Sequence, residues 1–216
     1  MQLINTTDNI PEEFYVFVTL SNFMTKNNYE NSKTFNSAAF GELSMSKDLL
    51  EKYITGTINY LPFTPNPNRS LHSVSPFHNS ITADYRTEYN VEIARQYSFP
   101  LYPSRLSATY AFGNYDSCLE VNRKYGWDLS TVKRFQLQKH PLNRVAKVNM
   151  EIISLERYAS RVSILDQNTC NLIWRHYWTG QGNIQMELPT LDMKREVYNS
   201  GVLWEYLIEG SITGID

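Results

Sequence analysis

Helix and strand signals are interleaved along this chain, without the regular strand–helix–strand alternation of a doubly wound parallel sheet. Residues 14–20 and 202–208 are rich in aromatic, β-branched and aliphatic side chains, which predicts buried strands near the two ends of the chain. Gly210 is expected to turn the second strand towards a final strand over 211–215. The pattern favours an α+β fold, and a length of 216 residues is that of a single domain, 1–216.

Several helices are expected between these two strands. Apolar residues recur at helical spacing in three segments: 44–53, 87–96 and 168–178. Asn114 is a candidate N-cap of a further helix, which runs to Tyr125 and is stopped by Gly126.

The remaining segments predict strands or loops. Apolar and polar residues suggest strands over 106–112 and 131–138, while 147–155 fits a strand or the start of a helix. The polar stretch 25–37 is expected to be a loop. The stretch 61–80 is expected to be irregular, because its prolines remove backbone donors and restrict φ.

Charge and composition exclude several classes of protein. Twenty Lys and Arg against 22 Asp and Glu give a net charge of −2, which excludes a uniformly basic nucleic-acid-binding surface. Cys118 and Cys170 are too few for a disulfide framework, and His72 and His78 match no common metal-ligand spacing. The N-terminus lacks the features of a signal peptide, and no apolar run suits a membrane helix. A soluble, cytoplasmic protein is expected.

The first candidate site residue is Arg105, which follows Pro103 and lies between two serines, Ser104 and Ser107. A guanidinium held at the junction of a loop and a strand suits a pyrophosphate or a carboxylate, and the hydroxyls suit an amide or a ribose. The alternative is that Arg105 pairs with a structural carboxylate. Glu92 and Asp116 are the candidates for that pairing.

The second candidate is Glu205, which alternates with Leu203 and Leu207 on one face of the expected strand. A carboxylate on an apolar face is costly unless it is paired or used in function, so Glu205 is a site candidate. The alternative is a strand-end glutamate that points to solvent, and Glu209 is expected to be a turn residue.

A third candidate is the aromatic cluster before Gly180 and Gly182. Aromatic faces beside a glycine-containing loop suit stacking on a flat ring, which makes Tyr177 and Trp178 candidates. The alternative is that these rings are ordinary core residues.

Three motifs resemble an ADP-ribosyltransferase-like group of bacterial and phage proteins: PSRLSATYAF (103–112), YWTG (177–180) and WEYLIEGSI (204–212). The resemblance spans residues 85–215. Some members of this group resemble toxins of toxin–antitoxin defence systems, of the mRNA-modifying CmdT type and, more distantly, of the DNA-modifying DarT type.

The resemblance implies two splayed β-sheets with NAD bound in the cleft between them and helices at their flanks. It implies that Glu205 is the catalytic residue and that no metal takes part. The residues that it implies in NAD binding are Thr19, Arg105, Ser107 and Tyr177. Many members of this group carry histidine or arginine two residues before the threonine, where this chain has Phe17.

The expected function is NAD-dependent transfer of ADP-ribose to a macromolecule, with RNA the favoured acceptor and a role as a toxin in anti-phage defence. The resemblance also allows an antitoxin or chaperone partner. Six cationic side chains could form a local basic patch for the acceptor, or an ordinary solvated face: Lys133, Arg134, Lys139, His140, Arg144 and Lys147. The alternative functions are a non-catalytic interaction protein with the same fold and an NAD glycohydrolase.

Overall fold

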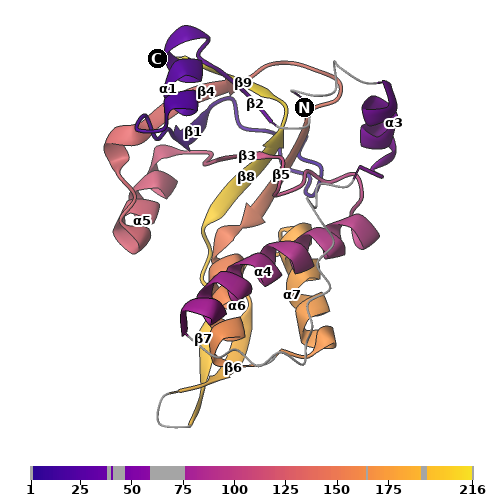
Figure 1. Cartoon of the computed structure of the whole chain (residues 1–216), viewed down its shortest axis with the longest axis vertical. Coiled ribbons are helices and arrows are strands. Elements are labelled where there is room, and N and C mark those ends of the chain that lie inside the picture. The colour runs from indigo at the N-terminus through magenta and orange to yellow at the C-terminus, as the bar shows by residue number, and fades with distance from the viewer. Residues whose placement is uncertain are drawn as a thin grey trace.

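The computed structural model describes residues 2–37, 40, 47–58, 76–163, 165–190 and 194–215, and at 23–24 and 76–84 it describes the backbone alone. Helices and antiparallel sheets are mixed in this part of the chain, so the expected α+β class is confirmed. Three helices gather at one end of the molecule and a four-stranded sheet lies at the other end (Figure 1).

The four-stranded sheet brings together strands from both ends of the chain. Its order is β1 (Phe14–Phe17), β4 (Val132–Leu137), β9 (Ser211–Gly214) and β2 (Thr34–Asn36), and every pair is antiparallel. Phe14, Phe135 and Ile212 are fully buried in the core of this sheet. Their burial explains why the aromatic run at the N-terminus forms a strand.

The second sheet has three strands, in the order β3 (Thr109–Ala111), β8 (Trp204–Glu209) and β5 (Arg144–Asn149). The backbones of Tyr15 and Phe112 exchange hydrogen bonds of 2.7 and 2.8 Å between N and O, which links this sheet to β1. A separate hairpin consists of β6 (Gln185–Pro189) and β7 (Arg195–Asn199).

Strand β8 lies between two hydrophobic cores. Tyr206 and Ile208 pack into the core of the four-stranded sheet, whereas Leu207 packs against the helices. Because side chains alternate along a strand, Glu205 and Glu209 share the helical face with Leu207.

Three helices cover that face: α4 (Pro76–Ser98), α6 (Met150–Val162) and α7 (Gln167–Thr179). Their core contains Trp174, Tyr177 and Trp178. The other helices are α1 (Phe23–Asn31), α3 (Lys47–Thr55) and α5 (Tyr115–Tyr125).

Local signals account for several of these elements. Helix α5 begins after Asn114, whose side chain accepts a hydrogen bond from Ser117 N, and it ends at Gly126 with φ of 70°. The segment 147–155, expected to be a strand or the start of a helix, contains both: the end of β5 and the first residues of α6. Strand β5 ends at Asn149, and the side chain of this residue caps α6.

Other expectations are wrong. The stretch 25–37 contains most of α1 and all of β2, because β2 is stabilised by its pairing with β9 rather than by its own polar sequence. Residues 76–80 belong to α4, which starts at Pro76, a position where a missing N–H does no harm. Residues 44–46 and 59–75, including His72, lie outside the described residues.

Candidate functional site

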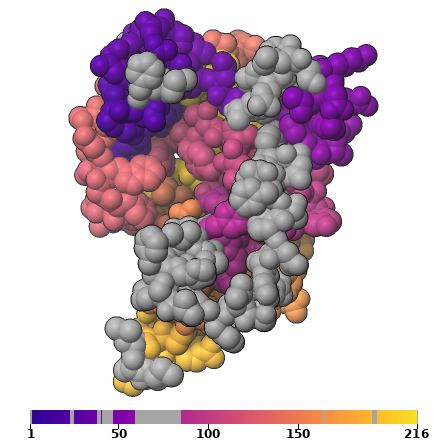
Figure 2. All heavy atoms as spheres, in the orientation of Figure 1, coloured from indigo at the N-terminus to yellow at the C-terminus, as the bar shows by residue number. Residues whose placement is uncertain are grey.

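A cleft of about 880 Å³ lies where the two larger sheets meet, a volume within the range of small-molecule sites. Four parts of the chain line it: the end of β1 with the residues after it, β3 with the residue after it, the segment after α5, and β8. The lining residues include Phe17, Thr19, Tyr110, Phe112, Trp127 and Glu205. On the face drawn in Figure 2, the molecule is hollowed beside the α5 region. The cleft therefore brings together Thr19 and Glu205, two expected site residues from opposite ends of the chain.

Aromatic rings line much of this cleft. The ring of Phe17 lies 5.2 Å from that of Trp127 and 6.0 Å from that of Phe112, both in edge-to-face geometry. Trp127 is 45% exposed, so part of its indole remains available at the surface. Such an arrangement suits a flat ring that stacks on or between these side chains.

Glu205 is the buried acid of the cleft. It is 6% exposed, and its Oε1 accepts a hydrogen bond of 3.0 Å from Arg105 Nη1. Burial raises the pKa of the Glu205 carboxyl, and the charge of Arg105 opposes part of that rise. The expectation that this carboxylate is paired or used, rather than directed to solvent, agrees with its burial.

Arg105 is held by three partners. Its Nε and Nη2 donate to the two oxygens of Glu88 at 3.0 and 3.1 Å, and its Nη1 donates to Tyr177 Oη at 2.7 Å as well as to Glu205. A guanidinium has five N–H donors, so most of its capacity is used inside the protein. Arg105 therefore pairs with carboxylates inside the protein, as the alternative predicts, but with Glu88 and Glu205 rather than with Glu92 or Asp116.

Glu88, on α4, is shared between two arginines. Its Oε1 also accepts a hydrogen bond of 2.8 Å from Arg157 Nη2, on α6. Burial alone raises the pKa of the Glu88 carboxyl, but the charges and hydrogen bonds of Arg105 and Arg157 outweigh burial and lower it below its ordinary value. Glu88 therefore stays ionised and holds Arg105 from the side opposite Glu205.

Tyr177 contributes to this network from the core. Its side chain is fully buried, its ring lies 5.0 Å from that of Trp178, and burial raises the pKa of its hydroxyl. Both rings lie in the core of the helical face, as the alternative of core residues predicts. Tyr177 hydrogen-bonds to Arg105 and is not among the described residues that line the cleft.

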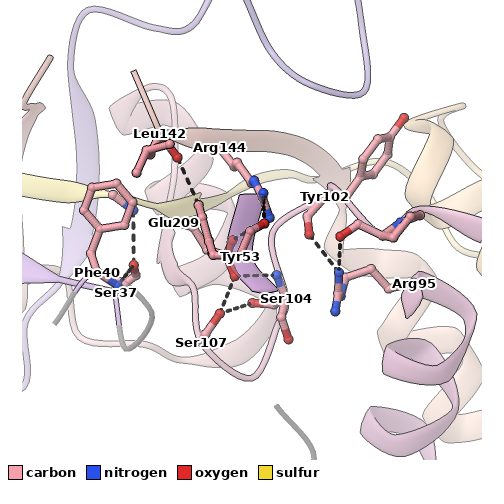
Figure 3. A network of polar contacts seen from close by, with 12 residues as sticks. Ser37, Phe40, Tyr53, Arg95, Tyr102, Ser104, Ser107, Leu142, Arg144 and Glu209 are labelled. Carbon is pink, nitrogen blue, oxygen red and sulfur yellow. Dashed lines mark hydrogen bonds and ion pairs between the residues drawn. The ribbon is translucent and has the colours of Figure 1, made fainter. Parts of the chain in front are cut away.

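Ser107 binds Glu209 rather than Glu205. Its hydroxyl donates to Glu209 Oε1 at 2.5 Å, and Ser107 is not among the described residues that line the cleft. Glu209 is the last residue of β8 and fully buried, so the expectation of a turn residue there is wrong. Figure 3 shows Ser104, Ser107, Glu209 and Arg144 in one polar network.

Sequence reasoning missed four residues of the site: Glu88, Tyr110, Trp127 and Arg157. Tyr110 lines the cleft, and its hydroxyl donates to the Arg105 carbonyl at 2.7 Å. Its place within the PSRLSATYAF motif was the one available signal. The other three lie in segments where no local pattern distinguishes them from surface residues.

Several of the six cationic side chains between 133 and 147 have acidic or aromatic partners within the protein. Arg144 is 3.9 Å from Glu209 and its guanidinium lies 3.7 Å from the ring of Tyr53, while Lys147 pairs with Asp8 at 3.0 Å. Arg134 pairs with Glu13 at 3.6 Å. Three of the six expected patch residues, Arg134, Arg144 and Lys147, are thus paired with carboxylates, which does not favour one continuous basic patch.

No family model matches the chain, and no curated protein shows a significant match. Across the described residues, no helix has the length and apolarity to cross a membrane. In the same part of the chain, no group of three or more His, Cys, Asp or Glu could hold a metal ion.

Proposed function

We propose that this protein cleaves the bond between nicotinamide and ribose in NAD and transfers ADP-ribose to a macromolecule. The observation that carries the proposal is the cleft itself, in which the buried carboxylate of Glu205 lies together with Thr19 and four aromatic rings. A cleft between two antiparallel sheets is also the arrangement that the resemblance to ADP-ribosyltransferase-like proteins implies.

The chemistry requires an anion below the reacting ribose. When the C1′–N bond breaks, its electron pair leaves with nicotinamide and positive charge develops on C1′ and the ring oxygen, as in glycoside cleavage. The carboxylate of Glu205 stabilises that charge, and low solvent access strengthens the effect. A nucleophile on the acceptor then bonds to C1′ and loses its proton.

The aromatic lining would hold a planar ring of the substrate. Phe17, Phe112 and Trp127 offer faces and edges on which nicotinamide can stack. Phe17 replaces the histidine of many relatives, so its contact with the substrate is apolar where theirs is a hydrogen bond.

Arg105 has a different role from the expected one. Because its donors are used by Glu88, Tyr177 and Glu205, we assign it to orienting the Glu205 carboxylate rather than to binding the NAD phosphates.

RNA is the acceptor to test first. Trp127, exposed at the cleft, offers a face for base stacking, which is a main source of affinity for single strands. The roles as a toxin in anti-phage defence and as a partner of an antitoxin or chaperone rest on the resemblance alone.

The decisive experiment is incubation of the protein with NAD labelled in its adenine, with and without RNA, DNA and protein. Release of nicotinamide together with label on RNA supports the proposal. Label on protein or DNA would replace RNA as the acceptor, and release into water alone would identify an NAD glycohydrolase. Absence of nicotinamide release under all conditions contradicts the proposal and leaves the non-catalytic interaction protein.

A further inference from the structure

Strand β8 contacts the turn 104–107 at two points. Glu205 and Glu209 lie on the same face of the strand, four residues and therefore about 13 Å apart. Glu205 accepts from the side chain of Arg105, whereas Glu209 accepts from the turn itself. One strand thus binds both the turn and the guanidinium that the turn carries.

Glu209 holds both ends of this turn. Its Oε1 accepts hydrogen bonds from Ser104 N at 3.0 Å and from Ser107 Oγ at 2.5 Å, and all three residues are buried (Figure 3). The Oε2 atom of Glu209 lies 3.9 Å from Arg144 Nη1. Hydrogen bonds to a buried carboxylate are stronger than neutral ones, so the turn has a rigid support.

Helix α4 supports the same turn from its other side. Ser104 Oγ donates to Glu92 Oε2 at 2.7 Å, and Arg95 binds both oxygens of Glu92 at 2.8 and 3.0 Å. Arg95 also donates to the carbonyls of Pro100 and Tyr102, which precede the turn. The entry to the turn is therefore fixed before the chain reaches Arg105.

Arg105 depends on this support because it lies in neither a helix nor a strand. The turn is closed by hydrogen bonds from Ser107 N and Ala108 N to the Ser104 carbonyl, at 3.2 and 2.9 Å. The Arg105 side chain is long, so even a small rotation of this turn would displace the guanidinium at its end from Glu205. Small displacements of that kind are enough to disturb an active site.

We propose that Ser107 and Glu209 are positioning residues, which fix the turn 104–107 and thereby hold Arg105 against the carboxylate of Glu205. Neither residue is among the described residues that line the cleft. The effect of these two residues on catalysis rests on the proposed function. Their effect on the pKa of Glu205, through Arg105, does not.

The test compares wild-type protein with Ser107→Ala, and uses Ser160→Ala as the matched control. Ser160 Oγ also donates to a buried glutamate, Glu156 Oε1 at 2.8 Å, but it lies on α6 away from the turn. The first measurement is the ¹³C titration of the Glu205 carboxyl, assigned with the Glu205→Gln spectrum. The second is kcat and KM for nicotinamide release.

We expect Ser107→Ala to raise the pKa of Glu205, because a looser Arg105 opposes the effect of burial less. We also expect kcat to fall by about tenfold with KM nearly unchanged, since orientation rather than substrate binding is lost. Ser160→Ala should leave both measurements at wild-type values. Ser107→Thr, which keeps the hydroxyl, should restore the wild-type titration.

An identical Glu205 titration in wild-type protein and Ser107→Ala would overturn the inference. If Ser107→Ala does not fold, Ser107→Cys gives the same comparison, because a thiol is a similar size and a weak donor. If the wild-type protein releases no nicotinamide, the proposed function fails, and the titration still decides the positioning role.

Discussion

Glu205 is the residue on which the proposed chemistry depends. Its burial on the helical face of β8 brings a negative charge into a site with little water, and Arg105 limits the energetic cost of that charge. A glutamate in this setting can stabilise a developing cation far more than one in water can.

We expect Glu205→Gln to lower kcat for nicotinamide release by about 10²–10³-fold, because the amide keeps the shape of the side chain and removes its charge. The measurement is steady-state release of nicotinamide, with thermal unfolding to check the fold. Glu187→Gln, at a surface glutamate paired with Arg195 on the β6–β7 hairpin, is the control and should keep full activity. Wild-type turnover in a folded Glu205→Gln protein would remove this residue from the mechanism.

Arg105→Lys separates the two roles considered for Arg105. Lysine keeps the charge but cannot bind Glu88 through two N–H groups while reaching Glu205 and Tyr177. If Arg105 orients Glu205, kcat falls while KM for NAD is nearly unchanged. A large rise in KM with kcat unchanged would instead assign Arg105 to the phosphates.

At the scale of elements, Asn149 joins β5, α6 and β8. Its Oδ1 accepts from Glu151 N at 3.1 Å, which caps α6, and from Leu203 N at 2.9 Å. Its Nδ2 donates to the carbonyls of Gly182 and Gly201, both at 2.8 Å. The side chain is fully buried, so each of these groups would lose its partner on truncation.

Asn149→Ala should therefore destabilise the protein by about 3 kcal/mol or more, the sum of a lost cap and of unpaired backbone groups. Asn114→Ala removes a similar cap at the exposed start of α5, and its cost should be about 1 kcal/mol. Urea unfolding of both variants measures the two values. Equal losses of stability would show that Asn149 acts as a cap alone.

At the scale of the whole molecule, Glu88 connects α4 to α6 through Arg157 and to the turn 104–107 through Arg105. Its pKa in the folded protein is lowered, so its ionised form stabilises the fold above the ordinary pKa of a glutamate. This stabilisation is lost as the pH falls through the lowered pKa of the folded state.

Glu88→Gln should consequently be less stable than wild type at neutral pH, and the difference should shrink as the pH falls below about 4.5. Thermal unfolding between pH 7 and pH 3 gives the difference directly. Glu120→Gln is the control, because Glu120 also has a lowered pKa but is paired with Arg123 in solvent, where ion pairs contribute little. A difference for Glu88→Gln that is independent of pH would contradict the linkage.

The sequence by itself determined the features that depend on neighbouring residues. The runs at 14–20 and 202–208 predicted β1 and β8, and Asn114 with Gly126 predicted the ends of α5. The alternation of Glu205 with leucines also identified a buried carboxylate. These signals are local, because side-chain periodicity and capping involve residues only a few positions apart.

Only the tertiary structure decided the partners of those residues. Strand β2 forms by pairing with β9. Arg105 donates hydrogen bonds to Glu88 and Glu205, and Ser107 donates to Glu209. Most of these contacts join residues about a hundred or more positions apart, and an arginine fits any carboxylate that the fold brings within reach. The local sequence could identify a charged side chain that needs a partner, but the choice of partner required the packing of α4 and β8 around the turn.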